Sequence, residues 1–69
     1  MLMYDYIVCY IFDREGYLTP CSGTMQLSRK KKIKTFNEVN ELANEIEERI
    51  DGASNLSINN LILLGRNRH

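Results

Sequence analysis

The chain has 69 residues, of which 43% are hydrophobic and 26% charged, and its formal net charge is zero. This length fits one domain and is too short for two, and the balanced charge excludes a strong overall field toward nucleic acid or membranes. Two cysteines are too few for a secreted disulfide scaffold, and neither a signal peptide nor a membrane-spanning apolar run is recognisable. We therefore expect a cytoplasmic protein with no membrane partner.

Residues 3–12 are rich in β-branched and aromatic side chains and predict a first strand. The sequence DREG at residues 13–16 predicts a turn, because its glycine can adopt a positive φ. Residues 17–27 predict a second strand, which completes a hairpin. Pro20 and Gly23 interrupt this strand, so we expect it at a sheet edge, bent or bulged there.

Residues 28–34 predict a basic loop. Thr35 and Glu38 fit a capping box, in which the Thr35 hydroxyl accepts from the Glu38 amide and the Glu38 carboxylate reaches back to the Thr35 amide. Apolar residues then recur at three- and four-residue steps, which predicts an amphipathic helix over residues 36–51. These residues are Phe36, Val39, Leu42, Ala43, Ile46 and Ile50. Gly52 is placed for a left-handed cap at the end of the helix.

Residues 58–64, which contain the run LILL, predict a short buried strand. Residues 65–69 predict a flexible polar tail that ends in His69. The order β-β-α-β predicts an α+β fold, with a three-stranded antiparallel sheet and one amphipathic helix on one face. The whole chain, residues 1–69, is expected to form a single domain.

The first strand is apolar on both sides, whereas one helix covers only one face of a sheet. If the hairpin loop is residues 14–16, Cys9 directly opposes Cys21 on the second strand. The compact side chains are then expected under the helix: Ile7, Cys9, Ile11, Cys21 and Met25. The aromatic side of the strand is expected to face away from it.

An uncovered aromatic surface of this kind marks a site for a protein partner. The predicted partner-binding residues are Tyr4, Tyr6, Tyr10 and Phe12. Acidic side chains of the helix are expected at the rim: Glu41, Glu45 and Glu48. The partner is a second copy of the chain or a host protein, and the sequence does not choose between them.

No constellation of residues predicts catalysis or metal binding. The single histidine is the last residue, and we interpret Cys9 and Cys21 as small core side chains, although the expected register also allows a cross-strand disulfide. Eleven residues separate the two cysteines, which does not match the spacing of a zinc site, and the glycines are isolated, so no phosphate-binding loop is present. We expect no enzyme, cofactor, metal or small-molecule site.

Residues 29–34 carry five positive charges in six residues, directly before a helix N-terminus that itself attracts anions. An alternative function is therefore contact with a nucleic-acid backbone. It would use Lys30, Lys31, Lys32, Lys34, Arg66 and Arg68. The competing interpretation is a solvated loop that protects a sheet edge.

The charges are unevenly distributed along the chain. Residues 36–51 hold six acidic residues and one arginine, a local net charge of −5, whereas the remainder holds eight basic and three acidic residues, +5. A third and weaker hypothesis is that the acidic helix mimics the charge of nucleic acid.

The sequences YDYIVCYIF (residues 4–12), SGT (22–24), KIKTFNE (32–38) and LILL (61–64) together resemble a type of small cytoplasmic protein. Such proteins are encoded by phages and prophages of Gram-positive bacteria. The long basic run, Pro20 and the C-terminal GRNRH depart from their pattern. The resemblance implies a phage or mobile-element origin and action by binding a host protein, for example as an inhibitor of host defence.

Overall fold

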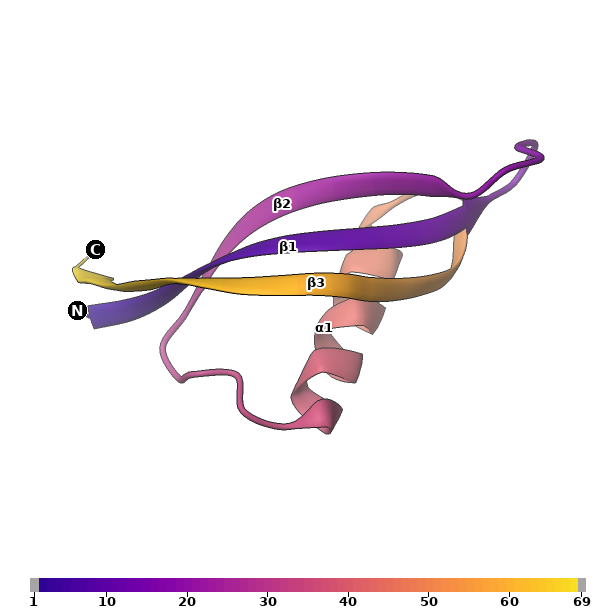
Figure 1. Cartoon of the computed structure of the whole chain (residues 1–69). Helices are drawn as coiled ribbons and strands as arrows, with labels where there is room; N and C mark the ends of the chain where they lie inside the picture. Colours follow the sequence, from indigo (N-terminus) through magenta and orange to yellow (C-terminus); the bar gives the residue numbers. More distant parts are fainter. Residues whose placement is uncertain (1, 69) are drawn as a thin grey trace.

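The computed structural model describes residues 2–68. The elements in chain order are β1 (Leu2–Arg14), β2 (Cys21–Arg29), α1 (Phe36–Arg49) and β3 (Ala53–Arg68). The strands form one antiparallel sheet in the order β2-β1-β3, and α1 lies on one side of it (Figure 1). The predicted α+β class and β-β-α-β arrangement are thus confirmed.

The strand boundaries differ from the predicted ones, most of all in β3. This strand covers Ala53–Arg68 instead of residues 58–64, and its last residues pair with the start of β1. Residues 65–68 are therefore strand and not a flexible tail, while His69 lies outside the described residues. Strand β3 makes three register shifts against β1, and at each of them β3 contains one residue more than the part of β1 that it faces.

The helix begins as predicted, with Thr35 as its N-cap. The Thr35 hydroxyl accepts from the Glu38 amide at 3.2 Å, and the Glu38 carboxylate accepts from the Thr35 hydroxyl and the Lys34 amide, instead of the expected Thr35 amide. The helix ends at Arg49, and Gly52 has a φ of +76°, the left-handed conformation predicted for it.

The hairpin register differs from the predicted one, because the loop is residues 15–20 and not 14–16. Phe12 pairs with Cys21, and Cys9 pairs with Thr24. This register is shifted by three residues from the expected one, and an odd shift reverses which β2 side chains share a face with a given β1 residue. The predicted opposition of Cys9 and Cys21 is therefore wrong: both thiols are free, and they lie on opposite faces.

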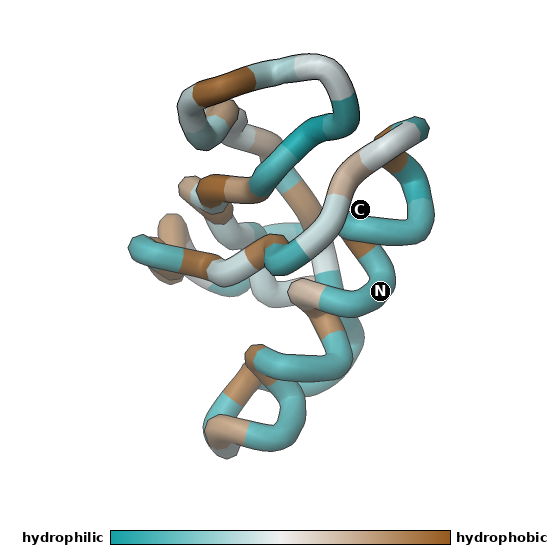
Figure 2. The backbone as a smooth tube through the Cα atoms, turned by 90° about the vertical axis from the view of Figure 1, so that its right-hand side faces the viewer, coloured by the Kyte–Doolittle hydropathy of each residue, from teal (hydrophilic) through white to brown (hydrophobic). Residues whose placement is uncertain are grey.

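The face of β1 that meets the helix is also the reverse of the predicted one. The buried core consists of Tyr6, Val8, Phe12, Leu42, Ala43, Ile46 and Leu56, and Tyr4 and Tyr10 are half-buried against it. The helix thus covers the aromatic side of the strand, because these large rings remove more apolar surface from water than the aliphatic side chains opposite them. Figure 2 shows that the hydrophobic residues occur as short stretches between hydrophilic ones along the backbone.

The position of the Tyr10 ring explains why the second strand carries a glycine at residue 23. These two residues pair across the β1–β2 ladder, and a Cβ atom at position 23 would lie 2.6 Å from the Tyr10 ring. The ring also contacts Phe12, with 5.9 Å between the ring centroids. Gly23 therefore leaves the space into which the Tyr10 ring packs, which is a common use of glycine inside a strand.

Candidate functional site

Basic residues from separate parts of the chain gather at one end of the sheet. Tyr4 of β1 pairs with Arg29 at the end of β2 and with Arg66 of β3, and Leu2 pairs with Arg68. Neighbouring strands lie about 4.8 Å apart, so the Arg29 and Arg66 backbones are roughly 10 Å from each other across β1. The loop of residues 30–35 begins directly after Arg29. We call the exposed cations of this region the basic end: Lys30, Lys31, Lys32, Lys34, Arg66 and Arg68.

The basic loop is attached to the core at its centre. The Ile33 amide donates a hydrogen bond of 2.8 Å to the hydroxyl of Tyr6, a residue that is only 3% exposed. The Ile33 side chain is partly buried and packs against the hydrophobic core. A β-branched apolar residue inside a run of lysines thus turns inward and leaves its basic neighbours facing solvent.

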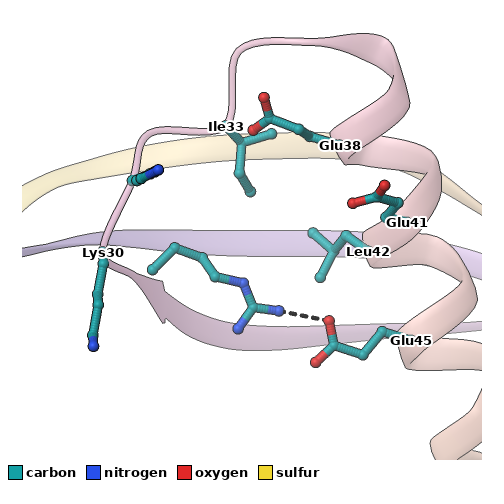
Figure 3. A pocket seen from close by; sticks show the side chains of 8 residues that line it. Lys30, Ile33, Glu38, Glu41, Leu42 and Glu45 are labelled. Atoms are coloured by element: carbon teal, nitrogen blue, oxygen red, sulfur yellow. Dashed lines mark hydrogen bonds and ion pairs between the residues drawn. The ribbon is translucent and has the colours of Figure 1, made fainter.

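Both ends of the loop are also fixed. At its start, the Arg29 guanidinium forms an ion pair of 2.8 Å with the Glu45 carboxylate of α1, drawn as a dashed line in Figure 3. At its end, the Glu38 carboxylate accepts from the Lys34 amide and the Thr35 hydroxyl. With Ile33 held between these two points, the loop presents its lysines from a defined backbone.

Two hollows flank this loop, and they differ in chemistry. One hollow of about 410 Å³ is lined by Tyr4 and Glu38 together with four lysines: Lys30, Lys31, Lys32 and Lys34. The other, of about 210 Å³, lies between the loop and α1 (Figure 3), and its lining combines three cations and three glutamates with two apolar side chains: Arg29, Lys30, Lys31, Glu38, Glu41, Glu45, Ile33 and Leu42. The first hollow is the one suited to an anion, since lysine ammonium groups bind phosphate oxygens as point charges.

The cations of the basic end keep their charges available. Within residues 2–68, the ion pairs that form join Arg29 and Arg49 to Glu45, and none involves the loop lysines, Arg66 or Arg68. Glu38, the acidic residue in the lysine-lined hollow, is engaged by the loop backbone and the Thr35 hydroxyl. The local charge around Tyr4 is therefore strongly positive although the whole chain is neutral.

The predicted partner-binding residues do not lie together on an exposed surface. Tyr6 and Phe12 belong to the buried core, Tyr10 packs over Gly23, and Tyr4 lines the lysine-lined hollow. They do not form a free aromatic surface, so that expectation is wrong. Of the expected rim charges, Glu45 binds Arg29 and Arg49, while Glu41 and Glu48 are exposed on α1.

The sequence predicts the basic residues of this site but assigns Tyr4 and Tyr6 to an aromatic partner surface instead. Tyr4 lies among the cations, and Tyr6 holds the loop. The available signal was Ile33, because one apolar residue inside a lysine run indicates a loop that is anchored and not freely solvated.

Other kinds of site are not found in the part of the chain that the structure describes. No group of three or more His, Cys, Asp or Glu residues could hold a metal ion between residues 2 and 68. Over the same residues, no helix has the length and apolarity needed to cross a membrane. No protein-family model, curated protein or solved structure matches this chain significantly. The resemblance to small phage proteins therefore stays a prediction.

Proposed function

We propose that this chain is a small non-catalytic binding protein that holds a nucleic-acid backbone at its basic end. The observation that carries the proposal is the convergence around Tyr4 of two arginines of β3 and four lysines whose loop is fixed at three points. Fixed cations lose less conformational freedom on binding than mobile ones, so they contribute more to affinity.

The chemistry of the site favours a phosphate chain over an isolated small anion. The cations come from a loop and from a neighbouring strand, so they extend beyond one hollow and can neutralise several phosphates at once. Tyr4 adds an aromatic ring among the lysines, which is the combination that proteins use for flexible nucleic-acid strands. The proposed setting is the cytoplasm of a bacterial host, with a phage or mobile element as the source of the gene.

The proposal predicts binding that weakens steeply as salt rises. If four to six phosphates are neutralised, log K should fall against log[salt] with a slope of about −3 to −5. We expect fluorescence anisotropy of labelled DNA and RNA oligonucleotides, measured between about 50 and 200 mM salt, to give this slope. Absence of binding to every oligonucleotide at the lowest salt would disprove the proposal.

Matched variants test whether the basic end carries the affinity. Lys31→Gln/Lys32→Gln should weaken binding roughly tenfold or more and reduce the salt slope by about 1 to 2, because two phosphate contacts are lost. Arg14→Glu changes the net charge by the same two units at the other end of β1 and should change affinity little. An equal loss in both variants would show that only net charge matters, and the site would be rejected.

A further inference from the structure

The face of the sheet opposite α1, which we call the open face, carries an apolar stripe. Its apolar positions are Met3, Ile7, Cys9 and Ile11 on the central strand β1, with Ile62 of β3 beside Ile7. No element of the described chain covers them, and Ile11 and Ile62 are 38% and 42% exposed. The sequence pattern predicts Ile7, Cys9 and Ile11 under the helix, whereas in the fold they lie on the face opposite to it.

On β2 and β3 the border of the stripe is polar but uncharged. The β2 positions of the open face are Ser22, Thr24, Gln26 and Ser28, and the β3 positions include Ser57, Asn60 and Asn67. The strand arginines pair with residues of the other face: Arg29 and Arg66 with Tyr4, and Arg68 with Leu2. An apolar centre with a polar rim is the usual anatomy of a protein interface.

The chain exposes more surface than a compact monomer of its mass. A folded monomer of 8.1 kDa exposes roughly 4,500 Å², whereas this chain exposes 5124 Å². The excess of roughly 600 Å², which belongs to the molecule as a whole, is of the same order as the ~800 Å² that each partner buries in a standard interface. The molecule is also extended, with a radius of gyration of 13.0 Å against about 11 Å for a compact chain of this length.

We infer that a second copy of this chain covers the open face, with the two sheets stacked on each other through their β1 stripes. A flat apolar stripe on the central strand is self-complementary, because a two-fold axis through it places apolar residues on apolar residues. No cation of the strands meets its own image there. Of the carboxylates of this face, Asp13 lies beyond Ile11, and Asp5 lies between Met3 and Ile7, where it accepts hydrogen bonds from Ser28 and Asn67. This inference does not depend on the proposed nucleic-acid binding.

Sedimentation from about 1 μM to about 1 mM protein, the range of moderate affinities, tests the inference. We expect twice the mass of one chain at the upper concentrations. Ile11→Thr/Ile62→Thr should weaken the dimer roughly 10- to 100-fold while circular dichroism stays unchanged, because threonine keeps the β-branched shape and loses apolar area. Leu2→Thr/Leu63→Thr is the matched control, since these residues are similarly exposed on the same strands but on the other face.

A second test uses the wild-type chain, so its result does not depend on whether the variants fold. Cys9 lies in the stripe and Cys21 on the helix-covered face, and trypsin separates them because Arg14 lies between. In a dimer, alkylation of Cys9 should slow as the protein concentration rises, while that of Cys21 should stay constant. A monomer at every concentration, a dimer insensitive to the isoleucine substitutions, or a concentration-independent Cys9 rate would each overturn the inference.

Discussion

The two faces of β1 are both apolar in sequence but differ in burial. The face with Tyr6, Val8 and Phe12 is sealed under α1, while the face with Ile7 and Ile11 meets solvent. The covered face also makes polar contacts, since the Tyr6 hydroxyl binds the Ile33 amide of the basic loop. The single helix therefore lies on the face where burial removes most apolar surface from water, and this is also the face that holds the basic loop.

Substitution of neighbouring residues on opposite faces gives the largest effect. Phe12→Ala should lower the free energy of unfolding by about 3–5 kcal/mol, because it opens a cavity in the core. Ile11→Ala should lower it by about 1 kcal/mol or less, since that side chain is already partly exposed. Urea denaturation at low protein concentration measures both values. Similar losses from the two variants would break the distinction between the faces.

The same comparison on β2 uses Gly23 and Thr24. Gly23→Val should lower the free energy of unfolding by about 1–3 kcal/mol, because its side chain would meet the Tyr10 ring on the covered face. Thr24→Val, on the open face, should be close to neutral. Thermal unfolding of both variants checks this. In a Tyr10→Leu background most of the cost of Gly23→Val should disappear, and an undiminished cost would rule out the ring contact as its cause.

The smallest effect concerns the hydrogen bond between the core and the basic loop. Tyr6→Phe should lower the free energy of unfolding by about 1 kcal/mol, the usual value for one hydrogen bond. It should also speed hydrogen exchange at the Ile33 amide, which loses its acceptor. Tyr10→Phe is the control, because within residues 2–68 its hydroxyl makes none of the side-chain hydrogen bonds found. Unchanged exchange at Ile33 in Tyr6→Phe would show that the loop is held by other contacts.

The fold class and the helix could be predicted because their signals are local. The capping residue Thr35 and the apolar spacing that follows it depend on one segment of chain, and the structure confirms them. The hairpin register depends on loop length instead, and residues 17–20 looked like strand although they belong to the loop. Because of this longer loop, Cys9 pairs with Thr24 and not with Cys21. The wrong register also contributed to the wrong prediction of which face of β1 lies under the helix.

The candidate site was predicted in part for a similar reason. The charges of the basic end are visible in the sequence, but their approach to Tyr4 depends on β3 continuing to Arg68, and this segment looked like a frayed tail. A glycine and polar residues gave no strand signal there, because this segment is a strand through its pairing with the start of β1, which follows a register shift between Asp5 and Tyr6. Long-range pairing of this kind cannot be read from one short segment.

The pairing of Leu2 with Arg68 has a practical consequence. The first and last described residues lie side by side at the basic end, so any affinity tag or fusion attached to either terminus begins next to the proposed binding surface. A polyhistidine tag there would add positive groups beside the basic end and alter the measured affinity for oligonucleotides. The hairpin loop at the other end of β1, where Leu18 is fully exposed, is the better attachment point for a dye or a surface linker.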